Sequence, residues 1–341
     1  MRSDSLTGRS VLIAENRASR PNEFAGAPAF SVGVVASNLG AACPFCAGSE
    51  TRTPAPTYEK LDEQGRWQVR VVPNVYPALT PAELVDTPSL ATTAGDHGDT
   101  GMQVTPAVGV HEVIIECPNH RDRLSALSVQ ELRMVVEAYV ERLLHWRQSG
   151  TYQYGLVFKN QGAAAGASIS HLHSQLIVVP RIPPIVAAES ARAREEYART
   201  QQCPYCRLVK TELAKGERIV VCREGFVAFC PFASWQPFEI WLMPANHDPS
   251  IELATPSKLD QLTYVLHALI SRLEAIVPGA AYNLLMRTAP WSDGCDEWSH
   301  WRIELLPRMN ALAGIEVATG IHINSMAPER AALKLRTGHG R

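Results

Sequence analysis

A short segment with the sequence His-Leu-His-Ser-Gln, residues 171–175, carries the side chains best suited to chemistry. Alternate residues of an extended strand share a face, so His171, His173 and Gln175 are expected to point the same way. A neutral imidazole can attack phosphorus near pH 7, and a neighbouring amide can hold the non-bridging phosphoryl oxygens. We therefore predict that His173 is a nucleophile supported by Gln175. The alternative, a metal site made by both histidines, suits His171 and leaves the other two side chains for chemistry.

The stretch before this segment is rich in glycine and small residues. Gly162 and Gly166 let the backbone approach a ligand closely, and successive free amides in such a turn form a nest for anions. Ser168 adds a hydroxyl donor. The pattern predicts a loop that cradles phosphate groups.

Two Cys-Pro-aromatic-Cys pairs have the spacing of zinc knuckles. A redox-active pair is the alternative, and the repetition of the spacing makes it less favoured. A structural zinc ion takes four ligands, and two histidines follow each cysteine pair in the same order. The sequence thus predicts two zinc ions per chain, the first held by Cys43, Cys46, His120 and His171 and the second by Cys203, Cys206, His247 and His300. The other four cysteines show no such pairing and are expected to be plain thiols: Cys117, Cys222, Cys230 and Cys295.

The two ligand sets belong to a half-repeat of the chain. His171 follows His120 by 51 residues, and His300 follows His247 by 53. At the positions of His173 and Gln175 the second half has Arg302 and Glu304. We interpret the chain as a duplicated module in which one copy kept the nucleophile, and we expect one active site per chain.

Each half has strand-like stretches and one long helix. The helix over 128–147 begins with a capping box of Ser128 and Glu131, and the helix over 255–276 begins with Thr255 and Pro256. Apolar residues at helical spacing in the first helix predict a buried face: Leu132, Val135, Val136, Tyr139 and Leu143. The predicted strands are 67–72, 111–117, 154–159, 170–179, 218–222, 226–231, 239–244, 282–287 and 300–307. Residues 80–103 are expected to be a loop, and 181–202 a linker that continues into a charged helical segment.

Length and composition indicate the number of domains and the class of protein. The 341 residues suggest two domains, 1–185 and 186–341, and the hydrophobic fraction of 46% suffices for packed cores. A net charge of -2 gives no indication of a nucleic-acid or membrane partner. The polar N-terminus is not a secretory signal, so we expect a cytoplasmic protein whose cysteines stay reduced.

Motifs along nearly the whole chain resemble the galactose-1-phosphate uridylyltransferase family of the histidine-triad superfamily. The resemblance rests on segments 6–8, 17–21, 43–46, 70–74, 109–113, 160–175, 231–234 and 314–316. It implies an α+β fold of two histidine-triad-like modules, each an antiparallel half-barrel sheet with a long helix. It also implies a homodimer, with residues near one site supplied by the partner.

The resemblance assigns roles to matching positions. His173 matches the residue that forms a covalent nucleotidyl-enzyme, and Gln175 the residue that holds the transferred phosphoryl group. Positions that contact the nucleotide sugar or its phosphates are matched by Arg17, Arg20, Asn74, Asn160 and Ser168. The first cysteine–histidine set matches the family's zinc site.

The chain also departs from the family. Some members carry a second metal site, for which Glu189 matches one ligand, but the later ligands are replaced at His300-Trp-Arg302-Ile-Glu304. His322 stands near the place of a glutamine in the sugar-binding tail. These departures resemble the branch that contains ADP-glucose phosphorylase.

The predicted activity is ping-pong transfer from a nucleotide sugar, in galactose metabolism if the donor is UDP-glucose and the acceptor galactose 1-phosphate. A nucleotide-sugar phosphorylase, a histidine-triad hydrolase and a catalytically silent zinc-binding scaffold are the alternatives.

Overall fold

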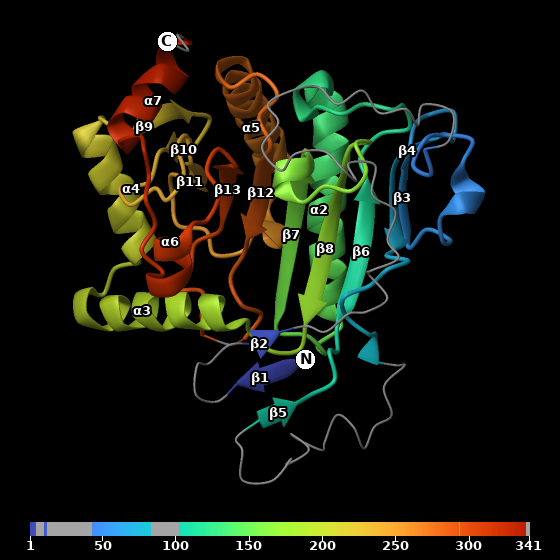
Figure 1. Ribbon diagram of the computed structural model, residues 1–341, viewed down its shortest axis with the longest axis horizontal. Helices are drawn as coiled ribbons and strands as arrows, with labels where there is room; N and C mark the ends of the chain where they lie inside the picture. Colours follow the sequence, from blue (N-terminus) through green and yellow to red (C-terminus); the bar gives the residue numbers. More distant parts are fainter. Residues whose placement is uncertain (5–9, 12–42, 83–101, 293, 339–341) are drawn as a thin grey trace.

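One ten-stranded antiparallel sheet forms the centre of the protein in the computed structural model, which describes residues 1–4, 10–11, 43–82, 102–292 and 294–338 (Figure 1). The strand order is β3-β4-β6-β8-β7-β12-β13-β11-β10-β9. In the first half of the chain the strands are β3 (Tyr58–Leu61), β4 (Trp67–Pro73), β6 (Val110–Ile115), β7 (Tyr154–Gln161) and β8 (His173–Val179). In the second half they are β9 (Ile219–Arg223), β10 (Phe226–Phe229), β11 (Ile240–Pro244), β12 (Tyr282–Arg287) and β13 (Arg302–Pro307).

The two halves of the sheet have the same strand order from edge to centre. They meet where β7 pairs with β12, with Asn160 opposite Asn283 and Phe158 opposite Leu285. The sheet and its helices confirm the α+β class. The two expected sheets are continuous with each other, because each half ends on an unpaired central strand that finds its partner in the other half.

Two long helices cover one face of the sheet (Figure 1). Helix α2 (Val129–Gln148) begins at the predicted capping box, where the Ser128 side chain accepts from the Glu131 amide and the Glu131 side chain accepts from the Ser128 amide. Helix α5 (Pro256–Ile276) begins at Thr255, whose side chain accepts from the Lys258 amide.

The core between these helices and the sheet is apolar. All five residues predicted for the buried face of α2 are at most 2% exposed: Leu132, Val135, Val136, Tyr139 and Leu143. Each such side chain stabilises the fold by about 1.5–3 kcal/mol relative to solvent exposure. The same cluster includes Leu269 and Ile270 of α5 and Leu284 and Met286 of β12.

The opposite face of the sheet carries the polar side chains considered below. A smaller apolar cluster of Val72, Val113 and Ile115, with Phe45 and Trp67 against it, lies beside them. Because strand residues alternate between faces, the core residues and the functional residues occupy alternate positions of the same strands.

The charged helical segment expected within residues 181–202 is α3 (Pro184–Thr200). Several other elements were not expected from the sequence. Cys203 is the N-cap residue of α4 (Pro204–Lys215). The chain ends with α6 (Gly314–Thr319) and α7 (Pro328–Thr337), and a small sheet joins β1 (Arg2–Asp4), β2 (Ser10–Val11) and β5 (Met102–Val104). Most of the predicted loop over 80–103 lies outside the described residues. No helix among the described residues is long and apolar enough to cross a membrane.

Candidate active site and metal centres

His173 is the first residue of β8 and is 8% exposed. Its Nδ1 lies 2.8 Å from the carbonyl oxygen of His171. A carbonyl oxygen only accepts, so Nδ1 carries the proton and Nε2 keeps its lone pair. The ring of Phe45, from the first cysteine pair, lies 5.3 Å away between centroids. The local backbone thus holds His173 in the tautomer in which Nε2 keeps the lone pair, as the predicted nucleophile requires.

Gln175 follows on the same face of β8 and is joined to a histidine of the neighbouring strand. Its Oε1 lies 2.9 Å from Nε2 of His111 on β6. Asn74, just after β4, places its Nδ2 3.0 Å from the same ring nitrogen. The structure therefore brings Gln175 and Asn74, 101 positions apart in the chain, around one imidazole.

The glycine-rich loop after β7 contains two glycines with positive φ angles. Gly162 and Gly166 have φ angles of 78° and 89°, which side-chain-bearing residues rarely adopt. The amides of Ala165 and Ala167 both donate to the Gly162 carbonyl, and the Gly166 amide donates to Ala163. These three amides are not free for an anion, so the predicted nest is wrong in this part, because the turn consumes its own donors.

Asn160 connects this loop to the second half of the chain. Its Oδ1 accepts a hydrogen bond from Asn283 Nδ2 at 2.8 Å, and Asn283 Nδ2 also donates to the Ala165 carbonyl oxygen at 3.0 Å. Arg308 in turn donates to Asn283 Oδ1 at 2.5 Å. Side chains from the second half therefore support the loop of the first.

A buried ion pair lies under the backbone of His173. Lys159 Nζ is 2.7 Å from Glu116 Oε2 and 3.0 Å from the His173 carbonyl oxygen. Tyr139 and Ser174 donate hydroxyls to the other carboxylate oxygen, each at 2.5 Å. Burial alone would raise the pKa of Glu116, but the ammonium and the hydroxyls hold it below its ordinary value. The pair fixes the start of β8 from the core side.

The first predicted metal set comes together as a compact cluster. The ligand atoms of Cys43, Cys46, His120 and His171 lie within 4.8 Å of one another. The His171 Nδ1 lies 3.5 Å from each thiol sulfur, and His120 Nδ1 lies 3.6 Å from that of Cys46. Ligands at zinc–sulfur and zinc–nitrogen distances of about 2.3 and 2.0–2.1 Å on a tetrahedron would be roughly 3.6 Å apart. The cluster therefore has the dimensions of a zinc site.

The second predicted set has the same arrangement. The ligand atoms of Cys203, Cys206, His247 and His300 also lie within 4.8 Å of one another. Distances from Cys206 Sγ to the Nδ1 atoms of His247 and His300 are 3.5 and 3.7 Å. Both sets can hold a metal ion.

Backbone carbonyls orient the deepest histidine of each cluster. His171 Nε2 lies 2.9 Å from the Cys117 oxygen, and His300 Nε2 lies 3.1 Å from the Pro244 oxygen. Each Nε2 therefore carries the proton, and each Nδ1 turns its lone pair toward the thiols, as in metal-ligating histidines with an outer partner. Burial lowers the pKa of both imidazoles to about 4, so both are neutral, as a ligand must be.

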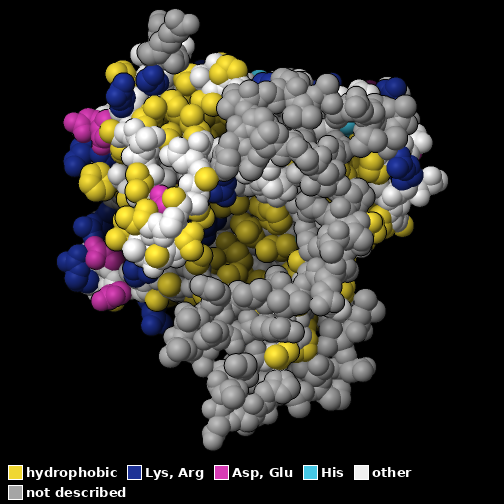
Figure 2. Space-filling model, viewed as in Figure 1, with side chains coloured by type: hydrophobic (Ala, Val, Ile, Leu, Met, Phe, Trp, Pro, Cys, Tyr) yellow, Lys and Arg dark blue, Asp and Glu magenta, His cyan; other side chains and the backbone are white. Residues whose placement is uncertain are grey.

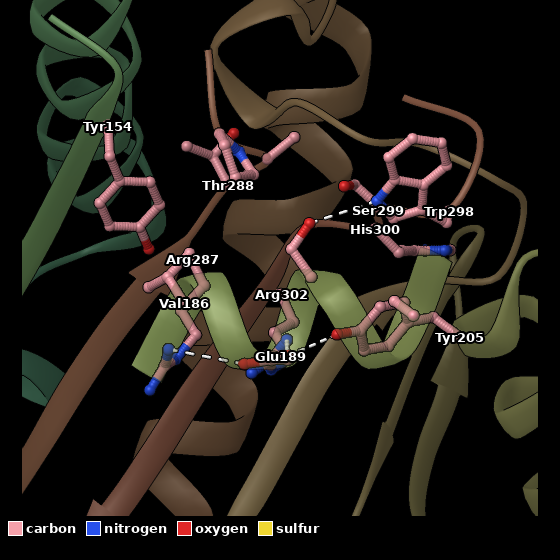
Figure 3. A pocket seen from close by; sticks show the side chains of 14 residues that line it. Tyr154, Val186, Glu189, Tyr205, Arg287, Thr288, Trp298, Ser299, His300 and Arg302 are labelled. Carbon is pink, nitrogen blue, oxygen red and sulfur yellow. Dashed lines mark hydrogen bonds and ion pairs between the residues drawn. The ribbon is translucent and has the colours of Figure 1, made fainter. Parts of the chain in front are cut away.

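The second half carries ion pairs at the positions that match His173 and Gln175 of the first half. Figure 3 shows Glu189 of α3 pointing toward Arg302 and Arg287. Arg302 lies 2.7 Å from Glu189 and 2.7 Å from Glu304, and its guanidinium is 4.5 Å from the Trp241 ring centroid. Tyr205 donates its hydroxyl to Glu189. Glu189, which the resemblance matched to a metal ligand, thus pairs with two guanidinium groups.

The space left beside these ion pairs is small. The cavity lined by Glu189, Arg302 and His300 measures about 40 Å³, room for only one or two water molecules. In the described part of the second half, Arg302 and Glu304, at the positions equivalent to His173 and Gln175, therefore form a buried, charged contact between the sheet and α3.

The exposed face of the sheet is hollowed near its centre, where Figure 2 shows hydrophobic side chains at the floor. Of the predicted substrate-binding residues, Asn74, Asn160, Gly162, Gly166 and Ser168 are described. Arg17 and Arg20 lie outside the described residues. No role was predicted for His111, although the alternation of side chains along β6 places it on the same face as Gln175.

Comparison with known proteins bears on the whole chain. The family model described as "Galactose-1-phosphate uridyl transferase, N-terminal domain" matches residues 1–183, and one for a domain of unknown function matches residues 111–337. An ADP-glucose phosphorylase of Arabidopsis thaliana is 30% identical over 340 residues, covering 98% of this chain and 92% of that protein. A galactose-1-phosphate uridylyltransferase of Thermotoga maritima is 25% identical, covering 67% of this chain and 74% of that protein.

Solved structures agree with these relatives. An ADP-glucose phosphorylase from Arabidopsis thaliana with bound ADP-glucose has a TM-score of 0.76 at 29% identity, with 94% of this chain and 92% of that chain covered. A uridylyltransferase structure has a TM-score of 0.77 at 26% identity, with 99% and 97% covered.

Fold, site and relatives together define an enzyme that transfers nucleotidyl groups. The chain belongs to the galactose-1-phosphate uridylyltransferase family.

Proposed function

We propose that the enzyme moves a nucleotidyl group from a nucleotide sugar to a phosphate-bearing acceptor through a covalent intermediate on His173. The observation that carries this proposal is the 2.8 Å contact of His173 Nδ1 with the His171 carbonyl oxygen. It leaves Nε2 unprotonated on a side chain that shares a face of β8 with Gln175, so one side chain can attack without a separate base.

The two half-reactions follow from this geometry. His173 Nε2 forms a bond to the α-phosphorus as the bond to the sugar 1-phosphate oxygen breaks, and sugar 1-phosphate leaves. An oxygen of the acceptor phosphate then attacks the same phosphorus, and the Nε2–phosphorus bond breaks. Gln175 holds a non-bridging oxygen in both steps, and Asn74, Asn160 and Ser168 hold the substrate, with Arg17 and Arg20 assigned to the same task from the sequence.

Two acceptors fit this proposal. Transfer of uridylyl from UDP-glucose to galactose 1-phosphate is supported by the family model over residues 1–183 and by relatives such as that of Thermotoga maritima. Transfer to inorganic phosphate is supported by the Arabidopsis phosphorylase, which is similar over 98% of this chain. The reaction at His173 is the same in both.

We propose zinc as the ion of both Cys2His2 clusters, since two thiolates and two imidazoles on a tetrahedron suit this ion. The ions would tie residues 43–46 to the start of β8 and residues 203–206 to the start of β13. They would act on structure, because four protein ligands leave no open position for substrate. Metal analysis of the purified protein should give about two zinc ions per chain, and a value near zero would overturn the assignment.

Labelled UDP-glucose and ADP-glucose test the central proposal. One of them should leave an acid-labile, alkali-stable label on the protein, and His173→Ala should abolish it. No label with either sugar, or an equal label in His173→Ala, would refute the proposal. Incubating the labelled enzyme with galactose 1-phosphate, inorganic phosphate or neither then separates the two transferases from a hydrolase, which releases nucleotide without an acceptor.

We also propose that the chain forms a homodimer in the cytoplasm. Five large apolar side chains near the C-terminus are 47–73% exposed, which indicates a surface for another chain: Leu312, Ile315, Val317, Ile321 and Ile323. A monomer in sedimentation analysis at micromolar concentration would refute the dimer.

A further inference from the structure

His111 is a buried histidine that the proposed mechanism does not use. It lies on β6, where Val113 pairs with Gln175 of β8 and His111 pairs with Ile177. Residues two apart on a strand share a face, so His111 and Gln175 are diagonal neighbours on the face that carries His173. Both side chains are 6% exposed, so their hydrogen bonds are made away from bulk water.

The hydrogen bonds of the imidazole determine where its proton is. The backbone amide of Ala78 donates to His111 Nδ1 at 3.0 Å. An amide N–H only donates, so Nδ1 is the unprotonated nitrogen and Nε2 carries the hydrogen. The Nε2–H therefore donates to Gln175 Oε1 at 2.9 Å. Asn74 Nδ2, 3.0 Å from the same nitrogen, cannot donate to it in this tautomer and stands beside it.

This hydrogen bond decides which end of the Gln175 amide faces the substrate. With Oε1 held by His111, the NH2 group is the end left for a ligand. An NH2 group stabilises the negative oxygens of a phosphoryl group on His173, whereas a carbonyl oxygen at the same place would repel them. Rotating the Gln175 amide by half a turn exchanges its oxygen and its NH2 group within the same space. A fixed hydrogen-bond donor is therefore needed to keep the oxygen on the side of His111.

We propose that His111 is a positioning residue that orients the Gln175 amide toward the phosphoryl group transferred through His173. The inference rests on the proposed function, since it needs a phosphoryl group on His173. The backbone amide of Ala78 acts through the same imidazole, because it holds the tautomer that makes Nε2 a donor.

Two substitutions of similar polarity separate positioning from structure. In His111→Asn the short amide can still accept from the Ala78 amide but does not reach Gln175. In His111→Gln the longer side chain places an N–H near the position of Nε2. We measure the single-turnover rate of His173 labelling against the concentration of labelled UDP-glucose or ADP-glucose, quenching with alkali.

The maximal rate should fall about 10- to 100-fold in His111→Asn, with a smaller change in the half-saturating concentration, since removal of a whole oxyanion donor costs about 10²–10³. His111→Gln should recover most of the rate. In a Gln175→Ala background, His111→Asn should cause no further loss, because the residue acts through the missing amide.

A wild-type rate in His111→Asn would overturn the inference, as would losses that multiply in the double variant. An equal loss in His111→Asn and His111→Gln with lowered thermal stability in both would assign the histidine a structural role and also overturn it. Failure of the proposed function gives a different result, since the wild-type protein would then take no label at all. In that case the inference about His111 would be wrong as well.

Discussion

Breaking the buried ion pair beneath His173 should strongly destabilise the protein. Lys159 and Glu116 are each 1% exposed, and their charged atoms lie 2.7 Å apart. At an effective dielectric constant of about 20 their attraction is roughly 6 kcal/mol, which offsets the several kcal/mol that each ion loses on leaving water. The intact pair is therefore nearly neutral for stability, but one partner alone leaves an uncompensated charge in the core.

We expect Lys159→Met to lower the free energy of unfolding by about 3–5 kcal/mol. Urea titration followed by tryptophan fluorescence should show a midpoint lower by about 1 M or more, for a slope of about 3 kcal/mol per M. The double variant Lys159→Met/Glu116→Gln should recover more than half of the loss, because the remaining amide can still accept from Tyr139 and Ser174. Arg66→Gln, which removes the exposed ion pair with Asp62, serves as the control and should leave the midpoint unchanged.

A loss below about 1 kcal/mol in Lys159→Met would refute the reasoning, since it would mean that Glu116 does not remain charged and buried. Additive losses in the double variant would refute it too, because they would show that the two side chains do not compensate each other.

Three further predictions follow from charges and ligands. Burial, together with the Glu304 charge, raises the pKa of Glu239 to about 7. Between pH 4.5 and pH 7 the folded protein therefore keeps a proton on Glu239 that the unfolded protein releases. The free energy of unfolding should fall as the pH rises through this range. The free energy of unfolding of Glu239→Gln, measured by urea titration, should rise relative to wild type by up to about 3 kcal/mol between pH 4.5 and pH 8. A difference between the two proteins that does not change with pH would contradict the raised pKa. Arg302→Met should lower unfolding stability by about 1–3 kcal/mol, because Glu189 and Glu304 lose buried hydrogen bonds and keep only their ion pairs with Arg287. His173 labelling per folded molecule should stay intact, and a loss of labelling would contradict one active site per chain. Cys206→Ser should lower the metal content from about two zinc ions per chain to about one, and retention of both would place the second ion elsewhere.

Local chemistry explains why much of the fold could be predicted from the sequence. The helix beginnings at Ser128 and Thr255 depend on side chains within three residues of the cap. The common face of His173 and Gln175 depends only on the two-residue period of a strand. The two metal clusters were predictable for a related reason, since a repeated Cys-x-x-Cys pair fixes half of each ligand set and the half-repeat supplies the order of the histidines.

Other features depend on contacts between distant segments. The continuous sheet needs β7 to pair with β12, and no local pattern specifies which edge meets which. The buried charged contact in the second half depends on Glu189 of α3 reaching Arg302, 113 positions away. The sequence does not predict the hydrogen bonds of the glycine-rich loop, because glycines indicate a permitted backbone but not which carbonyls its amides will reach.

The sequence by itself determined the chemical inventory: a strand face with His173 and Gln175, two Cys2His2 clusters and the elements that carry them. Tertiary structure decided the protonation and orientation of these side chains. It set the tautomer of His111 through the Ala78 amide, joined His111 to Gln175 across strands, and placed Lys159 under the start of β8. The physical reason is that tautomer, amide orientation and buried charge depend on atoms within about 3 Å, and those atoms come from residues far apart in the chain.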